Sequence, residues 1–111
     1  LTQDWSGKVW LNPPYARRVM DKWIDKLIYE YALGDISSWC VLVNNATDTR
    51  WAQDLLHEAS AICLLKGRIR FETPDRQDKR GPLQGQMIAY QGERTDRFVR
   101  TFRLAGVTYQ R

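Results

Sequence analysis

The sequence predicts an α/β fold, in which helices lie on the faces of a mainly parallel β-sheet. Two continuously apolar stretches, residues 39–43 and 61–65, have the composition of strands that are covered on both faces. Before each of them, at residues 16–33 and 50–59, apolar side chains recur at the spacing of an amphipathic helix. Strands that alternate with helices in this way are typical of a parallel sheet. The expected order is strand–helix–strand–helix–strand, followed by a hairpin-like pair and a final helix.

The composition indicates one domain, spanning residues 1–111, with a core of its own. Hydrophobic residues make up 43% of the chain and charged residues 27%, which is ordinary for a globular protein. No apolar run is long enough to cross a membrane, and no signal-peptide pattern is present. The formal net charge of +4 is compatible with a polyanionic partner.

Neither the cysteines nor the histidine predicts a chemical site. Cys40 and Cys63 lie within apolar runs of a chain without a secretory signal, so we expect reduced packing residues, with a disulfide as the lesser alternative. His57 lies in the middle of a predicted helix with no cysteine or histidine at ligand spacing, and no metal site is expected.

The first strand, residues 9–11, is expected to be short and buried, and it leads into a stiff corner. Asn12 precedes a proline and is therefore pushed towards an extended conformation. Pro13 and Pro14 have no N–H group, so the corner is poor in hydrogen-bond donors. Tyr15 adds an aromatic ring just before the next helix. The plain structural alternative is a Pro-Pro turn that ends the strand.

This corner suits chemistry on the exocyclic amine of a nucleobase, whose lone pair is delocalised into the ring. The side-chain carbonyl of Asn12 and the main-chain carbonyl of Pro13 can each accept one N–H of that amine, which would aim its lone pair at an electrophile. Tyr15 can stack on a base that has been taken out of the double helix. A strong base is not needed, because the nitrogen loses its proton easily once it carries the new bond.

A polar loop at residues 44–49 follows the second strand, and loops at the carboxyl ends of parallel strands are where open α/β sheets bind ligands. Thr47 or Thr49 is expected to cap the next helix. Asn44 and Asn45 are harder to explain as caps. They are therefore candidates for lining a substrate site.

Residues 68–71 alternate charged and apolar side chains, which predicts a half-exposed strand with Arg68 and Arg70 on one side. Together with Lys66, these arginines are candidate contacts to DNA phosphates. The alternative is that they serve only solubility. A polar surface loop is expected at residues 73–85.

The remaining elements are two helices and a strand. Helix 16–33 is expected to stop at Gly34, which supplies a left-handed residue. Residues 86–90 read as a strand, and residues 95–105 as a helix that ends at Gly106. The outward face of this last helix carries Arg97, Arg100 and Arg103.

Four segments stand out in order along the chain: WSGKVWLNPPY at 5–15, VLVNNATDT at 41–49, GRIRF at 67–71 and GQ at 85–86. Together they resemble the phage-type DNA N-6-adenine methyltransferases over about residues 5–92. The resemblance implies that Asn12, Pro13, Pro14 and Tyr15 form the catalytic motif. It also implies S-adenosyl-L-methionine as cofactor, with Asn12 bordering it, and adenine in double-stranded DNA as substrate. The implied setting is the cytoplasm of a bacterial host cell, and the implied fold is the second half of a Rossmann-like methyltransferase fold.

The family that these segments resemble has an acidic cofactor-binding segment upstream of the corner, and nothing here matches it. No Gly-x-Gly pattern follows a predicted strand either. We therefore expect the carboxyl-terminal part of a longer methyltransferase domain, with the rest of the cofactor site upstream of Leu1. Such a piece is expected to be inactive alone. It is also expected to self-associate through an uncovered sheet flank, with strand 9–11 as an open edge and apolar surface bare on the helix from Ala16.

Two other functions stay open from the sequence. A corner of this kind also resembles that of methyltransferases that act on a glutamine side chain of a protein. The second alternative is a non-catalytic fragment that keeps the corner and self-associates. The later segments favour DNA, but no residue reveals which DNA sequence is read.

Overall fold

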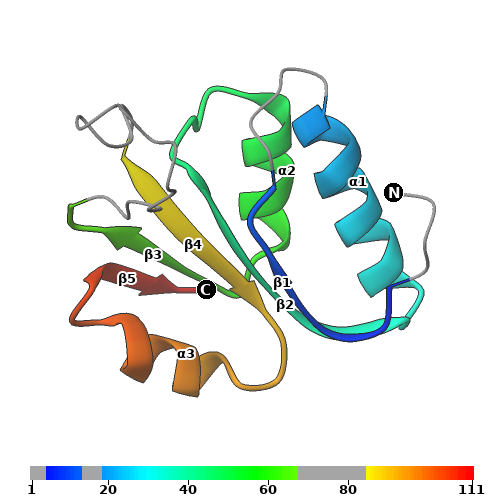
Figure 1. Ribbon diagram of the computed structural model, residues 1–111. Coiled ribbons are helices and arrows are strands. Elements are labelled where there is room, and N and C mark those ends of the chain that lie inside the picture. Colours follow the sequence, from blue (N-terminus) through cyan, green and yellow to red (C-terminus); the bar gives the residue numbers. More distant parts are fainter. Residues whose placement is uncertain (1–4, 14–18, 68–84) are drawn as a thin grey trace, which may run out of the picture.

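The computed structural model describes residues 5–13, 19–67 and 85–111 of the chain. Figure 1 shows a twisted sheet with helices on both of its faces. In chain order the elements are β1 (Gly7–Leu11), α1 (Val19–Ala32), β2 (Ile36–Asn44), α2 (Arg50–Glu58), β3 (Ala61–Leu65), β4 (Gln86–Gln91), α3 (Thr95–Phe102) and β5 (Gly106–Gln110).

The predicted α/β class is confirmed, but the prediction of a mainly parallel sheet is wrong. The sheet has the strand order β1-β2-β4-β3-β5. Only β1 and β2 pair in parallel. β4 is antiparallel to both of its neighbours, β2 and β3, and β5 is antiparallel to β3. The sheet is therefore mixed, and most of its pairings are antiparallel.

The physical reason lies in where β4 inserts. β1, β2 and β3 all point in the same direction, as the alternation with helices predicted. β4 lies between β2 and β3 and separates them, so two expected parallel neighbours each meet an antiparallel one instead. A continuously apolar run reports that a strand is covered on both faces. It does not report the direction of the strand beside it.

α1 and α2 cover one face of the sheet over β1, β2 and β4 (Figure 1). α1 points Met20, Ile24 and Leu27 inward, at the three- and four-residue spacing that puts side chains on one face of a helix. Ile24 and Leu27 are fully buried, and burial of each contributes about 1.5–3 kcal/mol. The inward side of α2 carries Trp51, Ala52 and Leu55.

α3 covers part of the opposite face. Its Phe98 is buried and stacks on Tyr90 of β4 with ring centroids 5.2 Å apart. Phe98 also packs against Phe102, at 4.8 Å. These rings form a second core cluster with Leu42 and Cys63, so the sheet has apolar packing on both sides. The exposed positions of Arg97, Arg100 and Arg103 agree with the predicted outward face of this helix.

The end of the chain differs from the prediction. α3 ends at Phe102 rather than at residue 105, and β5 follows it. Gly106 is not a helix stop but the first residue of β5, in the register position opposite Leu65. A Cβ at Gly106 would lie 2.0 Å from the carbonyl oxygen of Leu64, so only glycine allows the two strands to approach this closely. This packing requirement, rather than a turn, explains the glycine.

Smaller differences concern β1 and β2. β1 lies at one edge of the sheet, but it is less buried than predicted, because Trp10 is 59% exposed. β2 begins at Ile36, three residues earlier than the apolar run suggested. α1 ends as predicted just before Gly34, which has a φ of 83°. The expected strand at 68–71 and the first residues of the helix expected from 16 lie outside the described residues.

Cys40 and Cys63 are free, as predicted. Cys63 is fully buried, and its thiol donates to the carbonyl oxygen of Phe102 at 3.5 Å. Among the described residues, no helix combines the length and the apolar character that a bilayer crossing requires.

Candidate functional site

The carboxyl ends of β1, β2 and β3 and the beginning of β4 lie at one edge of the sheet. This edge lies towards the upper left of Figure 1, where β2 ends and β4 begins. We call this end of the strands the carboxyl edge; it is distinct from the edge strands of the sheet, which are β1 and β5. Polar residues gather there because each of the three parallel-pointing strands ends in a polar segment: Asn12 after β1, Asn44 and Asn45 at the end of β2, and Lys66 after β3.

Asn12 is exposed, while its two neighbours in the chain, Leu11 and Pro13, are buried. Leu11 is held opposite Val41 by the parallel pairing of β1 with β2. The amide of Asn12 is therefore presented to solvent from a backbone that is fixed on both sides. Pro14 and Tyr15, the rest of the predicted catalytic motif, lie outside the described residues.

Asn44 lies farther out than Asn12 in the direction of the strands. β2 continues three residues past Val41, the partner of Leu11, so Asn44 is about 10 Å beyond Leu11 along the strand direction. Asn44 is paired across strands with Gln86, which is only 4% exposed. The structure thus places Asn12 and Asn44 at the same edge of the sheet but not side by side.

Asn45 is tied to Gly85, a contact that sequence reasoning did not anticipate. The backbone N–H of Asn45 donates to the carbonyl oxygen of Gly85 at 3.0 Å. A Cβ at Gly85 would lie 2.9 Å from Nδ2 of Asn45, so glycine makes room for the amide. The signal was present in the sequence, because Gly85 and Gln86 form one of the four family-like segments, but neither was predicted as a site residue.

Thr49 caps α2, which confirms one of the two predicted caps. Its hydroxyl oxygen accepts from the backbone N–H of Ala52 at 3.3 Å and donates to the carbonyl oxygen of Ala46 at 2.7 Å. Thr47 instead accepts at its carbonyl oxygen from the side-chain amide of Gln53, at 2.6 Å. These bonds fix the loop that follows Asn45.

The basic candidates are only partly described. Lys66 is exposed, and its backbone N–H donates to the carbonyl oxygen of Ala105 at 3.0 Å, which ties the end of β3 to the segment before β5. Arg68 and Arg70 lie outside the described residues, so their role as phosphate contacts stays a prediction.

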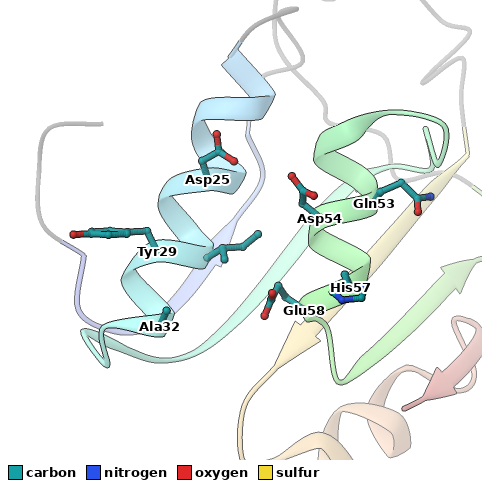
Figure 2. Close-up of a pocket in the computed structure, with 8 residues that line it drawn as sticks. Asp25, Tyr29, Ala32, Gln53, Asp54, His57 and Glu58 are labelled. Atoms are coloured by element: carbon teal, nitrogen blue, oxygen red, sulfur yellow. The ribbon is translucent and has the colours of Figure 1, made fainter.

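A hollow lined by described residues lies away from the carboxyl edge. It is a groove of about 600 Å³ between α1 and α2, and Figure 2 shows Asp25 of α1 across from Asp54 of α2, with Glu58 farther along α2. Arg50 bridges the two helices, with ion pairs to Asp25 at 3.2 Å and Asp54 at 2.8 Å. The acidic lining repels phosphates, which makes this groove unsuitable for DNA. Within the described ranges, no three potential ligands gather to hold a metal ion.

Comparison with known proteins identifies the family. The family model described as DNA N-6-adenine-methyltransferase (Dam) matches residues 1–101, which include the corner at Asn12 and the whole carboxyl edge. No curated protein and no solved structure matches the chain. Because the family match extends over most of the 111 residues, the chain belongs to the DNA N-6-adenine-methyltransferase (Dam) family.

Proposed function

We propose that this chain takes part in methyl transfer from S-adenosyl-L-methionine to the N6 amine of adenine in double-stranded DNA. The Dam family is adenine-specific, which favours this function over methylation of a glutamine side chain in a protein. The finer assignments, to a phage-type enzyme in the cytoplasm of a bacterial cell and to the carboxyl-terminal part of its catalytic domain, belong to the same proposal.

The observation that carries the proposal is the exposure of Asn12 between two buried residues, at the end of a strand. Its exposed side-chain carbonyl could accept an N–H from a target amine, and the burial of Leu11 and Pro13 favours a fixed backbone on either side of it. Preorganised polar groups of this kind stabilise a transition state because they need no reorganisation during the reaction. Tyr15 would stack on the adenine once it has left the double helix.

The described residues fit only part of the cofactor. Asn12 offers one amide at the carboxyl edge, and Asp48 is the only acidic side chain in the described segments that follow β1 and β2. Described residues line four hollows: between α1 and α2, along α1, beside β1 as far as Leu11, and beside the end of β5. We therefore assign to this chain the binding of the target amine, and no step that passes through the cofactor.

The test is an Asn12→Ala substitution, in a form of the protein that transfers methyl groups to DNA, whether this chain or a longer one that contains it. Asn12 is exposed, so the thermal unfolding midpoint should not change. Methyl transfer should fall by about 100- to 1,000-fold, the usual cost of one oriented polar group. Activity is measured with radiolabelled cofactor on unmethylated DNA.

Two controls sharpen the result. Asn12→Asp keeps an acceptor oxygen and should retain more activity than Asn12→Ala. DNA whose adenines already carry an N6 methyl group, and a glutamine-containing protein substrate, should both accept no label. Near-normal turnover by Asn12→Ala would refute the role of Asn12, and labelled protein would refute the substrate.

A further inference from the structure

β5 is the last strand of the sheet, and in the part of the chain that the structure describes its outer edge pairs with no other strand. Open edges usually carry a lysine, a proline or a bulge that blocks pairing with another chain. β1, at the other edge, carries Lys8 and runs into Asn12-Pro13. β5 has the sequence GVTYQ, with no charge and no proline. It is the less protected of the two edges.

The outward hydrogen-bonding groups of β5 belong to Gly106, Thr108 and Gln110. Partners in an antiparallel pair alternate along the strand. Arg111 donates its backbone N–H to Ser60 of the preceding segment, and Ala105 accepts from Lys66, so the odd-numbered residues face β3. The even-numbered residues between them face outward. Gly106 already accepts from the hydroxyl of Thr108 at 3.1 Å, which leaves one lone pair of its carbonyl oxygen.

One face of this edge is apolar. Val107 is 60% exposed and Tyr109 is 62% exposed. Val107 pairs with Leu64 of β3, and Tyr109 pairs with Ile62, so all four side chains lie on the same face of the sheet. Leu64 is itself 43% exposed. α1 and α2 lie on this side of the sheet but over β1, β2 and β4. Large apolar side chains at the open end of a sheet mark a surface for association.

We propose that a second copy of this chain pairs with β5 in antiparallel orientation, with the two-fold axis at Thr108. Each Thr108 would then donate to and accept from Thr108 of the second copy, and Gly106 would pair in the same way with Gln110. These are the residues whose backbone groups face outward. In this register Val107 faces Tyr109 of the second copy, at the non-hydrogen-bonded positions where cross-strand side chains come closest.

A second copy is the occupant that the sequence of β5 fits best, because the strand is complementary to itself. An apolar residue meets an apolar residue on both sides of the axis, and threonine meets threonine, a favourable cross-strand pair. No like charges meet, because Arg111 would lie opposite Ala105. Arg111 is also directed back to its own chain, where its guanidinium donates to the carbonyl oxygen of Leu56 at 3.0 Å. Such an isologous contact closes a dimer instead of growing a fibre.

The contact is small, which sets the expected affinity. A five-residue strand spans about 17 Å, so the buried area falls at the low end for specific interfaces. We expect a dimer with a dissociation constant between about 10 µM and about 500 µM. This association uses the edge opposite β1 and does not depend on methyl transfer.

Sedimentation of the 111-residue chain over a concentration series tests the proposal. The wild-type chain should shift from monomer to dimer between about 1 µM and 1 mM. Thr108→Pro removes the outward N–H at the axis without removing a bond to β3, and it should abolish the dimer. Val107→Lys and Tyr109→Glu should each weaken it at least tenfold, because each buries a charge against an apolar partner. Tyr29→Lys, at a 63% exposed site on α1, is the matched control and should leave the dimer intact.

A mixture of the Val107→Lys and Tyr109→Glu chains decides the register. It should form a heterodimer, because the new lysine and glutamate face each other across the axis. The proposal is overturned if the wild-type chain stays monomeric at 1 mM, or if a dimer survives both Thr108→Pro and Val107→Lys. It is also overturned if mixing does not restore association. Circular dichroism of every variant confirms that loss of the dimer is not loss of the fold.

Discussion

At the scale of single residues, the carboxyl edge depends on two close approaches that glycine permits, at Gly85 beside Asn45 and at Gly106 beside the carbonyl oxygen of Leu64. One of them brings Gly85 against Asn45, with the backbone bond of 3.0 Å beside a side-chain amide that leaves no room for a Cβ. The obstructing atom is the end of an exposed side chain, so the fold can adapt, but the amide must then move.

A double-mutant cycle tests this contact. Gly85→Ala should cost about 1 kcal/mol of unfolding free energy in the wild-type chain, measured by urea denaturation. In an Asn45→Ala background, the same change should cost nothing or stabilise slightly, because the clashing atoms are gone and the unfolded chain loses freedom. An equal cost in both backgrounds would mean that Gly85 is required by its backbone and not by Asn45.

A second prediction at this scale is that Cys40 is alkylated slowly in the folded chain. Burial raises the pKa of its thiol from 9.0 to about 11. At pH 8 the thiolate fraction, and with it the rate of alkylation, should be about 100-fold below that of the unfolded chain. The folded state keeps the proton of Cys40 to a higher pH than the unfolded chain does. Its contribution to the free energy of unfolding is therefore complete below pH 9 and is lost as the pH rises through about 11. Iodoacetamide labelling followed by mass spectrometry measures the rate of alkylation. Labelling of Cys40 in the folded chain at pH 8 as fast as in the unfolded chain would contradict the raised pKa of its thiol.

At the scale of elements, the ion pairs of Arg50 link α1 to α2. Arg50 is the first residue of α2, and it pairs with Asp21 and Asp25 of α1 and with Asp54 of its own helix. All of these side chains are about half exposed, so each pair is screened by solvent. The network matters because removal of Arg50 would leave three carboxylates facing one another.

We therefore expect Arg50→Met to lower the melting temperature by a few degrees at low salt. The loss should shrink in about 1 M sodium chloride, where the Debye length is only a few ångströms. Arg100→Met is the matched control, because Arg100 pairs with Asp96 within a single helix at 3.5 Å. A loss for Arg50→Met that is independent of salt would show that its packing matters instead of its charge.

At the scale of the whole molecule, the question is whether this chain binds the cofactor by itself. The carboxyl edge supplies amides from β1 and β2, while the described residues there fit only part of S-adenosyl-L-methionine. In open α/β sheets, ligands are held by loops from both sides of the site. The prediction that the chain alone is inactive follows from this partial fit.

Calorimetric titration of the 111-residue chain with S-adenosyl-L-methionine should give no binding tighter than about 1 mM, and methyl transfer to DNA should not exceed background. S-adenosyl-L-homocysteine serves as a second probe, since it lacks the methyl group but keeps the rest of the cofactor. Tight, stoichiometric binding of either compound would show that the site is complete within these residues.

Much of the candidate site was visible in the sequence. The order of apolar runs placed Asn12, Asn44 and Asn45 after strands, and strands with a common direction bring their ends to one edge. The contact between Asn45 and Gly85 was not visible, because the two residues are 40 positions apart and meet only through the pairing of β2 with β4. A role in catalysis for any of these residues stays a prediction.

The sequence by itself determined what depends on near neighbours: the inward stripes of α1 and α2 and the cap at Thr49. Only the tertiary structure decided that β4 lies between β2 and β3 and that the chain closes with β5. Helical spacing and caps are set within a few residues, so a local pattern contains them. Strand pairing joins residues far apart, and an apolar strand such as β4 fits beside a parallel or an antiparallel neighbour equally well. The order of the sheet is fixed only when all of its strands compete for partners at once.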